Sequence, residues 1–330
     1  MKIFLLIGII FSLHYYLLSH AYAEGFHFRK YAGEFMDIGV DARAQGMGGA
    51  FSSVEAGVTS IYYNPAGMIN VQKTQISFMH TQQMISSVNY DFFAVAHRQG
   101  KNRILGISLI RLGIDDIKDS RQAQRIISQN GDWNIDWNQI KEFNASDYIF
   151  MFSLAQQWKK KWALGINLKL VRRNLAENSA NGFGFDLGMQ RRITQGLTLG
   201  ANLKNITTTL LVWNTGEKEL VKPALYFGAS YLMNIQKINS SFQPVLDLIF
   251  RGENRRKSAS ANLSSMSFDY AAGIEYSYQR VLFIRAGVDE ISRLNIGTGL
   301  QIPHIRIDYA FTNYDKELGN SHRIGLVITL

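Results

Sequence analysis

The segment that comes closest to a metal-binding motif reads DWNIDWNQIKEF and begins at Asp132. Asp132, Asn134 and Asp136 alternate as the first three ligands of an EF-hand calcium loop do. The motif then fails, because Trp137 stands where the loop needs glycine and Phe143 stands where it needs a bidentate glutamate. We therefore interpret this segment as a surface loop whose tryptophans could contact a partner or an apolar ligand.

Other reactive residue types lack the spacing that chemistry needs. The chain has no cysteine, which excludes disulfides, cysteine-ligated zinc and cysteine nucleophiles. The histidines are widely separated, with no HExxH pair, and no GxSxG nucleophile elbow occurs. Gly46-Met47-Gly48-Gly49 lacks the third glycine of a dinucleotide fingerprint, and no Walker lysine follows it. We expect a protein that is not an enzyme and that binds no metal and no cofactor.

A third set of candidates consists of charged residues at alternate positions of apolar segments. Its members are Lys169, Asp186, Lys204, Glu275, Arg285, Arg306, Asp308 and Arg323. If these segments are strands with their apolar faces in lipid, the charges face a wet interior. There they either pair with one another and with an internal segment, or line a polar route. Arg306, Asp308 and Arg323 are the first choices for a functional role, because neighbouring strands bring them close.

The elements that would position these charges are β-strands. Within residues 161–172, bulky apolar residues alternate with small or polar ones such as Gly165, Asn167 and Lys169. Similar runs predict fourteen strands, near 73–80, 88–98, 102–111, 145–158, 161–173, 181–192, 196–206, 223–233, 242–251, 267–278, 280–288, 293–301, 304–312 and 321–330. Tight turns alternate with longer polar connections, near 112–144, 174–180, 207–222 and 252–266.

This layout predicts an all-β fold, a fourteen-stranded antiparallel transmembrane β-barrel over residues 71–330. A soluble β-sandwich would also alternate, but its bulky faces would fill a shared core and its polar faces would meet water. Fourteen strands close into a wide cylinder, and bulky faces directed into lipid explain the pattern better. An even strand count puts both ends of the barrel on the periplasmic side.

Residues 1–23 have the features of a signal peptide: Lys2, an apolar run and an Ala-Tyr-Ala site that predicts cleavage between Ala23 and Glu24. The alternative, a membrane anchor, needs a longer apolar run. We expect export to the outer membrane of a Gram-negative bacterium. The formal charge of +9 could indicate nucleic-acid binding. The basic residues are scattered in turns of an exported chain, so we expect contacts to outer-membrane lipid and no nucleic acid.

Residues 24–70 precede the first predicted strand, and a barrel this wide is open unless something fills it. Gly46, Gly48 and Gly49 belong to a small-residue stretch that can fold compactly inside a lumen. The residues Asn64, Pro65, Ala66 and Gly67 then form an NPAG turn that leads into the barrel. We interpret 24–70 as a hatch, or plug.

The segment IGVDARAQGMGGAFSSVEAGVTSIYYNPAGM resembles the N-terminal signature of the PorV/PorQ family, within the wider group of FadL-like outer-membrane barrels. FNASDYIF, GFGFDLGM, LTLGANLKNI and ELGNSHRIGL are similar to later family segments, in the right order. The C-terminal Arg323-x-Gly325-x-x-Ile328-x-Leu330 resembles the signal that barrel-assembly machinery reads, although it lacks the usual final aromatics.

The resemblance implies a fourteen-stranded barrel with an N-terminal hatch, and it leaves two functions open. The main hypothesis is a type IX-like component of protein secretion or surface attachment, with secreted cargo or attachment proteins as partners. The alternative is a FadL-like channel that takes up long-chain fatty acids or other hydrophobic small molecules.

Overall fold

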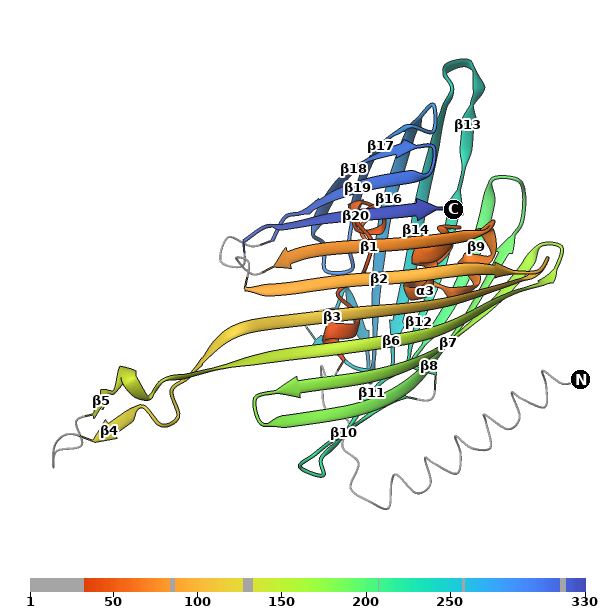
Figure 1. The fold of residues 1–330 in the computed structure, drawn as a ribbon. Coiled ribbons are helices and arrows are strands. Elements are labelled where there is room, and N and C mark those ends of the chain that lie inside the picture. Colours follow the sequence, from red (N-terminus) through yellow and green to blue (C-terminus); the bar gives the residue numbers. More distant parts are fainter. Residues whose placement is uncertain (1–32, 84–86, 127–132, 207, 257–258, 315–318) are drawn as a thin grey trace, which may run out of the picture.

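The chain forms one closed antiparallel β-barrel (Figure 1). The computed structural model describes residues 33–83, 87–126, 133–206, 208–256, 259–314 and 319–330. The predicted signal peptide and its cleavage site at Ala23 and Glu24 lie outside these residues. Closure comes from β1 (Thr74–Gln83), which pairs with β2 (Val88–Gln99) on one side and with β20 (Ser321–Thr329) on the other.

The predicted fourteen-stranded fold is confirmed. The sheet has 18 strand segments, of which four prolong a neighbouring wall strand. The other wall strands are β3 (Arg103–Asp119), β6 (Lys141–Lys159), β7 (Trp162–Leu175), β8 (Asn178–Arg192), β9 (Leu197–Lys204), β12 (Ala224–Tyr231), β14 (Ser240–Arg251), β16 (Met266–Tyr278), β17 (Leu282–Val288), β18 (Leu294–Ile302) and β19 (Ile305–Thr312). The prolonging segments are β10 (Thr209–Trp213), β11 (Lys218–Val221), β13 (Met233–Ile235) and β15 (Ala261–Leu263).

The wall has an apolar outer face and a polar inner face, the reverse of a soluble protein. On β17, Ile284 is 61% exposed, whereas the next residue, Arg285, is 2% exposed. On β7, Gly165 and Lys169 are buried inside, and Leu170 is exposed outside. Successive side chains of a strand point to opposite faces, so the alternation in the sequence becomes this two-faced wall. An apolar outer band of this kind is typical of barrels that lipid surrounds.

The two ends of the barrel differ. We call one end the turn end, because tight turns join β2 to β3, β6 to β7 and β16 to β17 there. Both termini of the wall also meet at this end, where the Leu330 amide donates to the Thr74 carbonyl at 2.9 Å. We call the opposite end the loop end. From it β3 and β6 project with a small sheet of β4 (Gln124–Ile126) and β5 (Trp133–Ile135), seen at the lower left of Figure 1.

Strands continue further than the sequence pattern indicates. The region 112–144, expected to be a loop, holds the end of β3, both β4 and β5, and the start of β6. The expected connections 207–222 and 252–266 likewise contain β10, β11 and β15. Outside the lipid, the outer face of a strand no longer has to be apolar. The alternation of apolar and polar residues therefore ends, although the hydrogen bonds between neighbouring strand backbones continue.

The lumen is occupied by the described part of residues 24–70, which we call the inner segment. It contains η1 (Glu34–Met36), α2 (Ala42–Gly46), η2 (Gly57–Thr59), α3 (Ser60–Tyr63) and η3 (Pro65–Asn70), drawn in red to orange in Figure 1. Two further short helices in the described residues, η4 (Trp137–Gln139) and η5 (Gln236–Ile238), have no buried residues. Among the described residues, no helix is long and apolar enough to cross a bilayer.

The inner segment runs from one end of the barrel to the other. Its first residues lie at the loop end, where Gly33 packs beside Val221 and Glu34 lies 3.8 Å from Arg255. Its last residues lie at the turn end, where the Arg98 guanidinium donates to the carbonyls of Ile69 and Val71 at 2.7 Å each. The segment therefore crosses the whole depth of the wall.

Candidate functional site

The NPAG residues contact β8 of the wall. Asn64 is fully buried, and its Oδ1 accepts the Ala66 amide at 3.2 Å, which caps η3. Its side-chain amide donates to the carbonyl of Ser52 at 2.7 Å and to that of Met189 at 3.1 Å. Pro65 stands at the first position of η3, where its missing N–H is not needed. One side chain thus joins a helix, a turn and the wall.

Two glycines of the wall make this contact possible. A Cβ at Gly165 of β7 would lie 2.3 Å from the Ala66 nitrogen, and one at Gly188 of β8 would lie 2.2 Å from Asn64 Oδ1. Any side chain at these positions would push the NPAG turn away from the wall. The glycine-rich stretch in the sequence predicts close approach within the inner segment, whereas these two glycines lie in the wall. The available signal was the recurrence of glycine on the inward faces of predicted strands.

Of the three glycines predicted in the inner segment, two have backbones that favour glycine. Gly48 and Gly49 have φ angles of +68° and +77°, in the left-handed region. A Cβ at Gly48 would also lie 2.4 Å from the Val288 carbonyl oxygen. Gly46 ends α2, and its Cβ would lie 3.1 Å from the Gly297 Cα, so this helix touches the wall backbone closely.

One group of predicted lumen charges forms a buried ion-pair network with the inner segment. We call it the Glu275 cluster. Arg43 of α2 and Arg285 of β17 donate to the Glu275 carboxylate at 2.7 and 2.6 Å. Arg306 lies 3.3 Å from the same carboxylate and also donates to Asp308 at 2.9 Å. A single buried carboxylate thus holds guanidinium groups from three elements.

The remaining predicted charges lie in two other places. Lys169 and Asp186 pair at 2.7 Å, and Lys204 lies 3.8 Å from Asp37 of the inner segment. Arg323 does not join Arg306 and Asp308; its Nη1 donates to the Gly39 carbonyl at 2.7 Å. The structure therefore brings Arg306 and Asp308 together, and it uses Arg323 as a separate wall contact to the inner segment.

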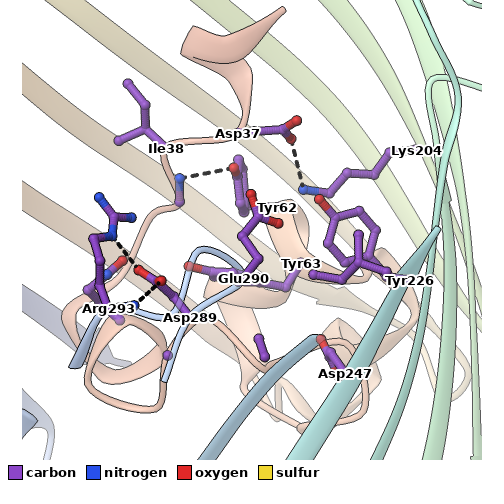
Figure 2. Close-up of a pocket in the computed structure, with 16 residues that line it drawn as sticks. Asp37, Ile38, Tyr62, Tyr63, Lys204, Tyr226, Asp247, Asp289, Glu290 and Arg293 are labelled. Atoms are coloured by element: carbon purple, nitrogen blue, oxygen red, sulfur yellow. Dashed lines mark hydrogen bonds and ion pairs between the residues drawn. The ribbon is translucent and has the colours of Figure 1, made fainter. Parts of the chain in front are cut away.

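A small cavity lies between the inner segment and the wall (Figure 2). Its volume is about 80 Å³, and its lining includes Asp37, Tyr62, Lys204, Tyr226 and Glu290. The Lys204 ammonium lies 4.1 Å from the ring centre of Tyr62 and 4.7 Å from that of Tyr226. The lining of this cavity is therefore aromatic and charged.

Among the residues that the structure describes, no group of three or more His, Asp or Glu side chains could hold a metal ion. Near the cavity, Asp289 accepts from the Arg293 guanidinium at 2.7 Å (Figure 2). Asp247 accepts from the backbone amides of Phe51 and Ser52 at 3.0 Å each.

The chain matches no protein-family model and no curated protein. Several solved structures are similar to it. The toluene transporter TbuX of Ralstonia pickettii has a TM-score of 0.54 and 14% identity, over 88% of this chain and 97% of that chain. The toluene transporter TodX of Pseudomonas putida gives the same values. The monoaromatic hydrocarbon channel CymD has a TM-score of 0.53 and 13% identity, over 89% and 98% of the two chains. This chain shares their fold.

Replacing the NPAG asparagine tests the role of the contact with β8. We expect Asn64→Ala to loosen the inner segment by about 1–3 kcal/mol, because the cap and buried hydrogen bonds are lost together. The barrel should still form, and cells should become more sensitive to a large antibiotic. Asn313→Ala, at an exposed position, is the control. Equal antibiotic sensitivity of the two variants and wild type would exclude a plug role for this turn.

Proposed function

We propose that this protein is an outer-membrane channel of a Gram-negative bacterium that takes up small hydrophobic molecules, and that its inner segment is a hatch. The observation that carries the proposal is a lumen filled along its depth by one segment, in a fold shared with three hydrocarbon transporters or channels. Uptake was the alternative in the sequence analysis, and the similarity of fold supports it better than secretion.

The outer face supports a position in the membrane. Trp158 and Trp162, at the turn end of β6 and β7, have ring centres 6.5 Å apart. The Arg191 guanidinium lies over Trp162, 4.7 Å from its ring centre. Tryptophan and arginine side by side are typical of the boundary between an apolar band and lipid headgroups. Short turns at this end suggest that it faces the periplasm.

The cavity size indicates a closed channel. Ligand pockets usually measure about 300–1,000 Å³, whereas the cavity between inner segment and wall measures about 80 Å³. A molecule the size of toluene therefore needs the hatch to shift before it can pass.

Uptake of a radiolabelled monoaromatic hydrocarbon tests the proposal directly. The protein is expressed in a Gram-negative host that lacks its own channels for hydrophobic molecules. We expect uptake several-fold above that of cells with an empty vector. Uptake equal to the empty vector, with folded protein present in the outer membrane, would overturn the proposal. Radiolabelled oleate in a parallel assay separates aromatic from fatty-acid substrates.

A role in secretion is a second candidate, suggested by the PorV/PorQ resemblance and by the projecting strands. Beyond the wall, Arg121 donates to both Asp119 and Glu177 at 2.9 Å, and this contact holds the pKa of the Glu177 carboxyl below its usual value. Trp137 of η4 is 73% exposed on the same projection. Crosslinking in native membranes followed by mass spectrometry would support secretion if surface proteins were recovered in stoichiometric amounts, and a lone barrel would contradict it.

A further inference from the structure

We propose that the outer wall carries a specific site for a phosphorylated glycolipid of the outer leaflet, at β1, β2, β3 and β20. The site has two parts, an apolar groove for an acyl chain and a polar row for phosphate. It is separate from the lumen. It rests on the outer-membrane position proposed above, but not on uptake.

The groove has a volume of about 510 Å³. The outward side chains Phe78, Phe93, Leu109, Ile324 and Leu326 line it. The rings of Phe78 and Phe93 lie 4.9 Å apart, and the buried Met79 and Phe92 lie beneath them. At about 25 cal/mol per Å² of apolar surface, an acyl chain in this groove is favoured over a flat contact because more of its surface is covered.

Polar side chains cross the wall directly beside the groove. The strand register places His80 of β1 opposite Asp91, Asp91 opposite Arg111, and Arg111 opposite Tyr148 of β6. The same register continues from Tyr148 to Arg172 of β7. On its own strand, each of these residues is the next outward-facing residue beyond the apolar ones, in the direction of the loop end. The row therefore lies where an outer-leaflet headgroup would begin.

The charges of this row favour an anion. His80 Nδ1 lies 2.7 Å from one Asp91 oxygen, and Arg111 Nη1 lies 3.3 Å from the other. Arg172 donates instead to the neutral amide oxygens of Asn174 and Asn181, at 3.0 Å each. The row thus holds two guanidinium groups and one carboxylate. Guanidinium groups bind phosphate with two parallel hydrogen bonds, so the surplus positive charge matches a phosphate.

The spacing fits a headgroup with two phosphates. Arg111 and Arg172 stand on strands separated by one strand, which corresponds to about 10 Å across the wall. A diphosphorylated glycolipid can place a phosphate at each guanidinium while an acyl chain enters the groove. A phospholipid with a single phosphate can use only one of them, so we expect it to bind more weakly.

Native mass spectrometry with diphosphorylated lipid A as the probe tests this site. The purified protein in detergent should retain one lipid A, and Arg111→Gln with Arg172→Gln should lower the affinity about tenfold or more, because charge-assisted hydrogen bonds are lost. Arg103→Gln is the matched control, since Arg103 lies on β3 at the turn end of the same apolar run and donates to Gln156. Its lipid binding should stay at the wild-type level.

Two comparisons of lipid binding test whether this site exists. Equal lipid A binding by the double variant and wild type overturns the site, and so does equal binding of phosphatidylglycerol by the wild type. Folding is checked by the mobility of unheated samples on gels. If the double variant does not fold, Phe78→Ala replaces it, and loss of lipid A binding is again expected. Uptake is measured separately, so that a failed lipid site leaves the channel proposal standing, and the reverse.

Discussion

If the inner segment is the hatch of the proposed uptake channel, a disulfide formed by the paired substitutions Ala42→Cys and Gly325→Cys should stop uptake, and reduction should restore it. The Ala42 Cβ and a Cβ built at Gly325 of β20 lie 3.5 Å apart, within the range of about 3.5–4.5 Å for disulfides. Such a bond would tie α2 to the wall. Because the present cavity is too small for a ligand, a hatch that cannot move should leave the channel closed.

The controls for this experiment are simple because the chain has no cysteine of its own. Each single substitution should transport like the wild type, with or without reductant. Mobility on non-reducing gels reports whether the bond has formed. Full uptake by the oxidised double variant would show that α2 stays in place during transport, and that substrate takes a route that leaves this helix untouched.

Loss of the Glu275 carboxylate should have the largest effect on stability. Glu275→Gln leaves Arg43, Arg285 and Arg306 without their shared partner, and the side chain of Arg285 is fully buried. Breaking a buried ion pair from one side costs about 3–5 kcal/mol, since an uncompensated charge remains in a region of low dielectric constant. We expect unfolding at lower urea concentration, measured by the folded band on unheated gels, and higher antibiotic sensitivity.

A surface carboxylate provides the comparison. Glu142 lies 3.9 Å from Lys118, and both side chains are more than half exposed. Glu142→Gln should therefore lower stability by less than about 1 kcal/mol. If both variants unfold at the same urea concentration as the wild type, the ion pairs of the Glu275 cluster do not contribute to the stability of the folded protein.

Much of the wall could be predicted from the sequence, because a strand in lipid must alternate. Residues 161–173 were predicted as a strand, and β7 covers Trp162–Leu175 with the expected faces. The prediction lost accuracy where lipid ends. The strands β3 and β6 continue through residues that form no apolar face. They are paired there by backbone hydrogen bonds, which do not depend on residue type and so cannot be recognised in the sequence.

The lumen could be predicted only in outline. Alternation shows that Lys169, Arg306 and Arg323 face inward, but not which partner each meets. Arg323 contacts a backbone carbonyl at Gly39, far away in sequence, and no side-chain pattern marks such an acceptor. The close approach at Gly165 depends in the same way on the path of another segment. Contacts between distant backbone groups are a property of the folded chain.

The inner segment touches both strands at the seam where the barrel closes. The Gln75 side chain of β1 accepts the Val58 amide at 3.0 Å, and Arg323 of β20 donates to Gly39 at 2.7 Å. The inner segment precedes every wall strand in the chain, whereas the pairing of β1 with β20 joins its most distant strands. The wall must close around a segment synthesised before it. We expect this segment to guide the final pairing, as a template on which the first and last strands meet.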